Sequence, residues 1–291
     1  MAEVGWHDRY YSAQDGLKLH FRDYGDALSP ATPVLCLAGL TRNARDFHKL
    51  ALRLSAERRV LAPDYRGRGG SAFDPDARNY RPETVLGDIL HLLTLSGCHR
   101  AVVVGTSFGG VLAMAMAAAC PTVLAGVVLN DVGPEISNEG MDRIRQYVGA
   151  EVIPPDHEAG ARQLAEMMGA AYPDFSHDDW LAEARARYPV MPDGSLGLEY
   201  DPAIAGPLAD AGGRPVDLWA LFGALARVPV LVIRGALSDI LSEATFRRMA
   251  EAKPDLEGLT VEGRGHVPLL TEPSCATAIE AFLERIDRER D

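Results

Sequence analysis

Five residues near the middle of the chain have the types and spacing of a nucleophile site. The segment G-T-S-F-G at 105–109 follows an apolar run at 101–104 and precedes a helix-like stretch rich in Ala and Met. A sharp strand-to-helix turn exposes its central side chain, and it needs very small residues two positions before and after. The pattern predicts Ser107 as a nucleophile at a helix N-terminus, where the N–H of Phe108 would stabilise an oxyanion. A glycine-rich turn with a capping serine is the alternative.

A serine nucleophile needs a histidine base, because its hydroxyl is a weak nucleophile near neutral pH. His266 stands in the segment G-R-G-H-V-P at 263–268, directly after a predicted strand at 259–262. The other histidines lie in a predicted hairpin, in or beside predicted helices, or in a helical region, where their expected roles are structural. We therefore expect His266 to be the base, in a loop at the carboxyl end of a strand.

The third member of such a site is an acid that orients the histidine and stabilises the imidazolium. Asp239 follows the apolar run at 230–234 and precedes His266 in the chain, which makes it our choice. Its alternative role is to cap a predicted helix at 243–252. Asp131 is the rival acid, since it also ends a predicted strand.

The surrounding segments predict alternating strands and helices. An antiparallel hairpin is expected at 9–12 and 17–23 around the Asp15-Gly16 turn. Valine-rich runs without polar alternation favour a mostly parallel sheet with helices on both faces. The remaining predicted strands are 34–38, 59–62, 101–105, 123–129, 228–234 and 259–262, and the helices flanking them are 44–57, 83–96, 109–119, 217–226, 243–252 and 275–290.

Between 133 and 215 the strand-like runs disappear. Predicted amphipathic helices at 143–148, 158–171 and 178–187 are separated by Pro and Gly, which indicates an inserted helical cap. We therefore expect a core in two parts, 1–132 and 216–291, with the cap at 133–215 between them.

Composition narrows the classes of function. The formal net charge of −12, from 29 Lys and Arg against 41 Asp and Glu, opposes binding to nucleic acid or to an anionic membrane. The sequence lacks a stretch resembling a signal peptide or a transmembrane helix, so we expect a cytoplasmic protein. The four cysteines have neither disulfide nor zinc-site spacing, and the expected chemistry needs no metal or cofactor.

Taken together, these motifs resemble the α/β-hydrolase superfamily over nearly the whole chain. The segment at 64–71 also resembles the family's D-x-R-G-x-G-x-S loop, whose role there is mainly structural. Family members usually carry His-Gly after the first buried core strand, whereas this chain has Ala38-Gly39-Leu40. The resemblance implies the backbone N–H of Leu40 as the second oxyanion donor. Relatives with Asp at the elbow, the haloalkane dehalogenases and epoxide hydrolases, are excluded because Ser107 stands there.

The expected function is hydrolysis of an ester-like bond, a carboxylic ester or lactone, in a small organic molecule through an acyl-enzyme. The resemblance leaves open a C–C bond hydrolase of ring-cleavage products, a cofactor-free perhydrolase, or a small-molecule receptor with little turnover. The expected partner is a small-molecule substrate. The residues expected to contact it are Asn43, Tyr147, Trp219, Phe222 and Val267.

Overall fold

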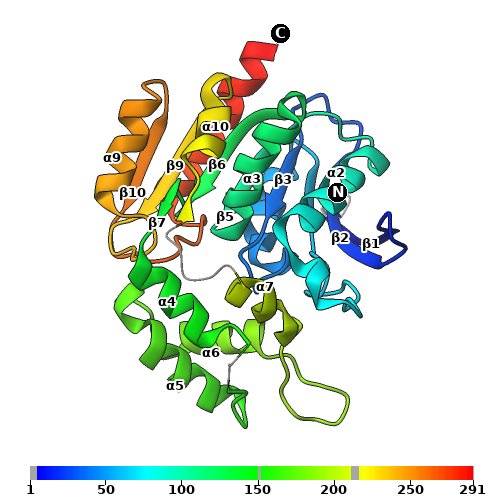
Figure 1. Ribbon diagram of the computed structural model, residues 1–291, viewed down its shortest axis with the longest axis vertical. Coiled ribbons are helices and arrows are strands. Elements are labelled where there is room, and N and C mark those ends of the chain that lie inside the picture. Colours follow the sequence, from blue (N-terminus) through cyan, green and yellow to red (C-terminus); the bar gives the residue numbers. More distant parts are fainter. Residues whose placement is uncertain (1–4, 150–151, 211–215, 291) are drawn as a thin grey trace.

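The computed structural model describes residues 5–149, 152–210 and 216–290. Within these ranges, eight strands form one sheet in the order β1-β2-β4-β3-β5-β6-β9-β10. The first two pairings, β1 with β2 and β2 with β4, are antiparallel, and the others are parallel. The predicted α/β architecture with a mostly parallel sheet flanked by helices is confirmed (Figure 1).

The strands end close to the predicted positions. The hairpin turns through a hydrogen bond from the Ala13 N–H to the Leu17 carbonyl and through Gly16 at φ +87°, a conformation that glycine adopts without strain. The strands of the sheet are β1 (Trp6–Ser12), β2 (Lys18–Tyr24), β3 (Val34–Leu37), β4 (Val60–Pro63), β5 (Ala101–Thr106), β6 (Leu124–Asn130), β9 (Val230–Gly235) and β10 (Glu257–Val261).

Helices cover both faces of the sheet. Helix α3 packs on β3, β5 and β6 and contacts α2, whereas α10 packs on β6, β9 and β10 from the other face. The α-helices are α1 (His48–Leu54), α2 (Pro82–Leu95), α3 (Phe108–Ala119), α4 (Asn138–Tyr147), α5 (His157–Met168), α6 (His177–Arg187), α7 (Ala205–Asp210), α8 (Trp219–Gly223), α9 (Glu243–Ala252) and α10 (Pro273–Arg290).

Several local differences separate the elements from their predicted form. The helix expected at 44–57 is divided into a 3-10 turn at 44–47 and α1, because Asn43 caps the turn through the N–H of Arg45. The helix expected at 217–226 is shorter, since Val216 and Asp217 form a two-residue strand, β8, that pairs with β7 (Glu135–Ile136). Helix α7 has no counterpart among the predicted elements.

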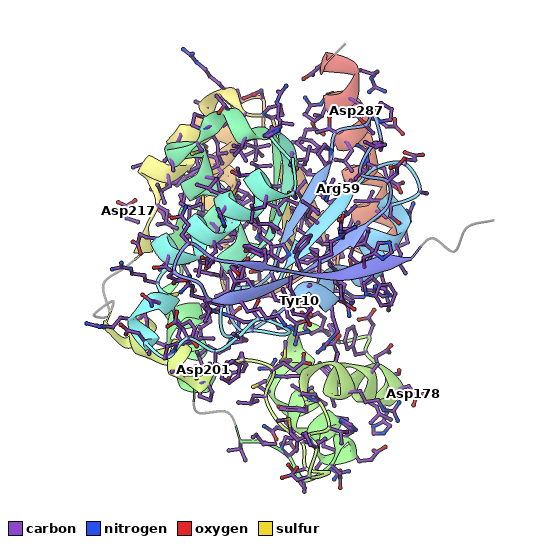
Figure 2. All side chains as sticks on the ribbon, turned by 90° about the vertical axis from the view of Figure 1, so that its right-hand side faces the viewer. Tyr10, Arg59, Asp178, Asp201, Asp217 and Asp287 are labelled. Atoms are coloured by element: carbon purple, nitrogen blue, oxygen red, sulfur yellow. The ribbon has the colours of Figure 1, made fainter. Side chains whose placement is uncertain are left out.

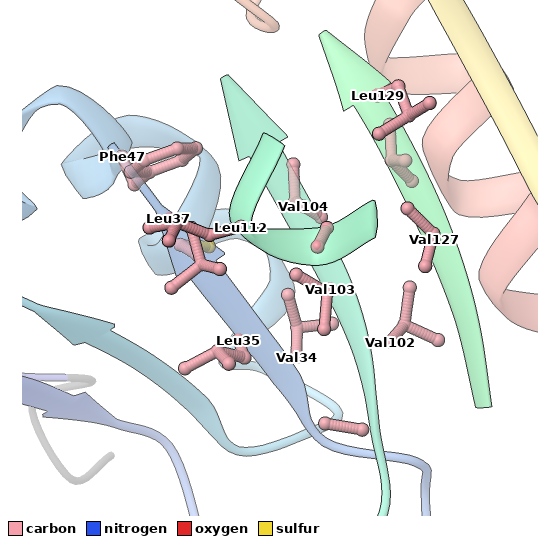
Figure 3. Packing of buried hydrophobic residues seen from close by; sticks show 14 of the residues in the cluster. Val34, Leu35, Leu37, Phe47, Val102, Val103, Val104, Leu112, Val127 and Leu129 are labelled. Carbon is pink, nitrogen blue, oxygen red and sulfur yellow. The ribbon is translucent and has the colours of Figure 1, made fainter. Parts of the chain in front are cut away.

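The main core lies between the sheet and its helices. Strands β3, β5, β6 and β9 are buried along nearly their whole length, in agreement with their continuous apolar sequences. Burying one Val, Leu or Phe side chain, relative to leaving it exposed, contributes about 1.5–3 kcal/mol to the stability of the fold. Figure 3 shows part of this packing, including Val34, Leu35, Leu37, Phe47, Val102, Val103, Val104, Leu112, Val127 and Leu129.

Helices α4 to α7 lie between β6 and β9 in the chain and beyond one end of the sheet in space (Figure 1). Figure 2 places Asp178 of α6 and Asp287 of α10 at opposite ends of the molecule. Helices α5 and α6 enclose a small apolar cluster of their own, in which Trp180 and Tyr188 are buried. In the parts of the chain that are described, no helix is both long and apolar enough to cross a membrane.

Candidate active site

Ser107 lies at the turn between β5 and α3 in a conformation that a regular strand or helix does not allow. Its φ is 51° and its ψ is −115°, and the residue is half-buried and lines a cavity. A Cβ on Gly109 would lie 2.0 Å from the Leu37 carbonyl oxygen, and one on Gly105 would lie 2.5 Å from the Gly109 carbonyl oxygen. Only glycine fits at either position, so the G-x-S-x-G spacing follows from backbone packing.

The structure brings Ser107 and His266 together. His266 Nε2 lies 3.0 Å from Ser107 Oγ, a hydrogen-bond distance across 159 positions of sequence. On the other side of the ring, His266 Nδ1 lies 2.7 Å from Asp131 Oδ2. Asp131 is fully buried, immediately after β6, with a φ of 54° that turns the chain sharply away from the strand. The three side chains form the serine, histidine and acid arrangement of an activated nucleophile.

The Asp131 carboxylate is held by donors besides the histidine. The N–H of Gly235 donates to Oδ1 at 2.8 Å, and the Ser238 hydroxyl donates to Oδ2 at 2.6 Å. A buried carboxylate is costly unless such bonds satisfy it. They fix the plane of the carboxylate, which in turn fixes the ring of His266.

The choice of Asp239 as the acid is wrong, because Asp239 does not lie beside His266. Its carboxylate forms a two-bond ion pair with Arg143 of α4, with Asp239 Oδ1 2.9 Å from Arg143 Nη2. Both side chains are about one-third exposed. Asp239 does not cap α9 either, since that cap is Ser242, which accepts from the Thr245 N–H. The rival residue, Asp131, occupies the position beside His266 because its strand neighbours β5.

The loop carrying His266 is held by residues of the helical segment and of β6. The Tyr172 hydroxyl accepts from the Val267 N–H and donates to the Val267 carbonyl, both at 2.8 Å. Burial raises the pKa of Tyr172, so the hydroxyl keeps its proton for this pair of bonds. The Gly265 N–H donates to the Ala171 carbonyl at 2.7 Å, and the Asn130 amide donates to the Pro268 carbonyl at 2.9 Å.

The two expected oxyanion donors lie on adjoining segments. Phe108 is the first residue of α3, and a helix's first N–H groups have no partner within the helix. Leu40 follows β3 and lines the same pocket as Ser107 and His266. The close approach of Gly109 to Leu37 and Ala38 places the two segments against each other.

A cavity of about 200 Å³ opens beside Ser107 and His266. Leu40 and Val267 line it, together with Leu164 and Met168 of α5 and Trp180 of α6. Its volume lies below the roughly 300–1,000 Å³ of pockets for drug-sized ligands. The cavity therefore suits a small, largely apolar molecule.

Three residues expected to contact substrate lie elsewhere. Asn43 caps the 3-10 turn and donates to Glu199 at 2.8 Å, so its amide is used structurally. Trp219 donates from Nε1 to Glu135 at 2.7 Å, and Phe222 is buried in the main core. The side chain of the fourth, Tyr147, lies outside the described part of the structure.

Sequence reasoning missed the residues that support the site. Ser238 lies one residue before Asp239, yet its hydroxyl is the group that reaches Asp131. Tyr172 lies in the helical segment, far in sequence from the loop it binds. Neither residue carried a signal in the sequence, whereas Asp131 itself stood as the rival acid because it ends a predicted strand.

Comparison with known proteins gives a consistent result. A sequence model of the alpha/beta hydrolase family matches residues 34–281. A 3-hydroxybutyrate-oligomer hydrolase from Cupriavidus necator is 32% identical over 88% of this chain and 89% of its own. A 2-(acetamidomethylene)succinate hydrolase from Mesorhizobium japonicum is 29% identical over 87% of each chain.

Solved structures agree with the sequence relatives. The crystal structure of an alpha/beta hydrolase from Novosphingobium aromaticivorans is 47% identical, with a TM-score of 0.91 over 98% of this chain and 99% of that one. The sheet order, the glycine-flanked Ser107 turn and these similarities lead to one conclusion: the chain belongs to the alpha/beta hydrolase family.

Proposed function

We propose that this protein is a serine hydrolase that cleaves an ester bond in a small molecule through an acyl-enzyme. The observation that carries this proposal is the continuous path of hydrogen-bond distances from Asp131 through His266 to Ser107, which lines the cavity. His266 takes the proton of Ser107 as its Oγ attacks the carbonyl carbon. The Leu40 and Phe108 amides receive the oxyanion, and His266 then returns the proton to the departing alcohol.

Deacylation uses the same groups in a second cycle. A water molecule loses a proton to His266 Nε2 and attacks the acyl carbon, and the bond to Ser107 Oγ breaks as the serine regains a proton. Asp131 stays ionised throughout and stabilises the imidazolium form of His266. Helices α5 and α6 act as a cap in this scheme, since they contribute side chains to the cavity wall.

We further propose a short hydroxy-acid ester as the substrate class. The relative from Cupriavidus necator is named for oligomers of 3-hydroxybutyrate, and the alignment with it covers nearly all of both chains. A short oligomer of this kind alternates apolar methyl groups with ester oxygens. The cavity is small and has an apolar wall, with charged Arg42 and Glu183 among its lining residues.

Active-site labelling combined with turnover tests the proposal. Wild type, Ser107→Ala and the control Ser274→Ala are treated with a fluorophosphonate probe, and hydrolysis of p-nitrophenyl butyrate and linear 3-hydroxybutyrate dimer is followed. Ser274 is exposed on α10, so its substitution should change neither signal. We expect labelling and turnover of wild type and the control, with a loss of several orders of magnitude in Ser107→Ala.

Two outcomes would contradict the proposal. Labelling of Ser107 without hydrolysis of any ester would favour the receptor interpretation. Turnover that persists in Ser107→Ala would remove the serine mechanism altogether.

A further inference from the structure

The segment at 38–40 replaces the family's usual His-Gly with Ala-Gly, yet its backbone is held at every carbonyl. The Ala38 carbonyl accepts from the Tyr65 hydroxyl at 3.0 Å. The Gly39 carbonyl accepts from the Arg42 N–H at 3.1 Å, and the Leu40 carbonyl accepts from Arg68 Nε at 2.9 Å. Three successive peptide planes are therefore fixed by three different donors.

The middle plane is the one that matters for chemistry. In a trans peptide the C=O and N–H point in opposite directions, so the Gly39 carbonyl bond to Arg42 also sets the direction of the Leu40 N–H. Rotating this plane alone requires compensating changes in the backbone angles on either side. The bonds from Tyr65 and Arg68 oppose such a change, because they anchor the planes before and after it.

Tyr65 and Arg68 are themselves rigidly placed. Tyr65 is 3% exposed and Arg68 is fully buried, and the Arg68 guanidinium lies 5.7 Å from the ring centre of Tyr65. Arg68 Nη1 also donates to the Arg66 carbonyl at 2.8 Å, so the guanidinium plane has two fixed points. Burying this cation is costly, and burial lowers its pKa to about 10.

Tyr65 also contacts the other half of the oxyanion site. Its ring packs edge-to-face against Phe108, with ring centres 5.8 Å apart. The Tyr65 hydroxyl therefore binds the segment that carries the Leu40 N–H. Its ring packs against Phe108, whose N–H is the other expected donor. Tyr65 therefore adds a side-chain link between the two segments, beside the backbone contact at Gly109.

We propose that Tyr65 and Arg68 are positioning residues that hold the Leu40 N–H in the direction required for oxyanion binding, in place of the missing histidine. Neither side chain is among the residues lining the cavity, so neither contacts substrate. Their effect is on the transition state, because only there does the oxyanion form. This inference rests on the proposed serine-hydrolase function.

The test uses two substitutions, each of which removes the side-chain bond to one carbonyl of the segment at 38–40. Tyr65→Phe deletes the hydroxyl and keeps the ring on Phe108, and Arg68→Met keeps much of the volume while freeing the Leu40 carbonyl. The matched controls are Tyr10→Phe and Arg78→Met, whose side chains are exposed and do not line the cavity. Melting temperatures establish that each variant folds.

Two ligands separate transition-state binding from ground-state binding. An alkyl boronic acid forms a tetrahedral adduct with Ser107 Oγ, whose oxygen occupies the oxyanion site, whereas butyrate resembles a product. We expect kcat for p-nitrophenyl butyrate and boronic acid affinity to fall together, by about tenfold in Tyr65→Phe and about a hundredfold in Arg68→Met. KM and butyrate affinity should stay within about twofold of wild type, and the controls should match wild type.

The results for the two variants test the role of Tyr65 and Arg68, and the labelling of wild type tests the proposed function. Full kcat and full boronic acid affinity in both folded variants would overturn it, and so would a parallel loss of butyrate and boronic acid binding. If Arg68→Met does not fold, Tyr65→Phe decides alone. Failure of wild type to react with the fluorophosphonate would instead refute the proposed function.

Discussion

Replacing Asp131 by Asn should disable the base while leaving the fold intact. The Gly235 N–H can only donate, so the Asn oxygen must face it, and the Asn amide nitrogen then occupies the place of Oδ2. There it donates toward His266 Nδ1, which becomes an acceptor and moves the ring proton to Nε2. A protonated Nε2 facing Ser107 Oγ at 3.0 Å cannot accept the serine proton.

The magnitude follows from the tautomer. Loss of the orienting acid in serine proteases lowers kcat by about 10⁴-fold, which corresponds to about 5.4 kcal/mol of activation free energy. We expect Asp131→Asn to lose about 10³- to 10⁴-fold in kcat. Asp239→Asn is the matched control: it also converts an Asp that follows a strand to Asn, but its carboxylate pairs with Arg143, a residue of the cavity wall, and not with His266. Its kcat should remain within about threefold of wild type, since partly exposed ion pairs contribute little.

Steady-state hydrolysis of p-nitrophenyl butyrate and the rate constant of fluorophosphonate labelling measure the effect. Both should fall in Asp131→Asn and stay near wild type in Asp239→Asn, with melting temperatures confirming that both proteins fold. A thousandfold loss in Asp239→Asn with near-normal activity in Asp131→Asn would refute the reasoning from the geometry.

Two further predictions concern stability. Gly109→Ala should lower the free energy of unfolding by about 2–4 kcal/mol in urea titrations, because the new Cβ would overlap the Leu37 carbonyl. The control Gly223→Ala should leave the free energy of unfolding near that of wild type, because a Cβ there meets nothing within 4 Å. Equal losses in the two variants would contradict the packing argument. Burial lowers the pKa of His20, but hydrogen bonds and charges from Asp64 and Asp8 outweigh it and hold that pKa above its ordinary 6.5. A raised pKa stabilises the fold fully below about pH 6.5 and progressively less as pH rises through the folded value. The free energy of unfolding lost in His20→Gln should therefore be larger at about pH 6 than at about pH 9. A loss that grows as pH rises would contradict this prediction.

The sheet and the turn at Ser107 were predictable because local rules determine them. Uninterrupted valine runs are typical of strands buried on both faces, and the turn at 105–109 leaves room only for glycine on either side of the serine. His266 was found because it follows a strand at the same edge of a parallel sheet. For the strands and the turn the residues involved are close in sequence, so a short window carries the signal.

The acid was not determined by such a rule. Asp131 and Asp239 both follow parallel strands, and the distinction depends on which carboxylate the backbone turns toward His266. That choice is made by the left-handed φ of Asp131 and by the Ser238 hydroxyl, which approaches from another strand end. Contacts of this kind across a hundred residues leave no local pattern.

Two of the residues expected to contact substrate, Trp219 and Phe222, lie outside the cavity for a related reason. Trp219 and Phe222 are large and apolar, but such side chains serve a core and a pocket equally well. The packing of α8 against α3 decides the outcome, since it directs Phe222 into the core and leaves Trp219 to Glu135. Their roles depend on how helices pack, which their own sequence does not specify.

The bonds between 171–172 and 265–267 bear on how this protein could be redesigned. A chimera that exchanges the helices between β6 and β9 for those of a relative is made to alter substrate preference alone. Here the exchange would also remove the two bonds from Tyr172 to Val267 and the one from Gly265 to Ala171. A chimera that keeps Ala171 and Tyr172 retains these bonds to the loop at 265–267. A chimera that replaces these two residues changes the support of His266 together with the cavity wall.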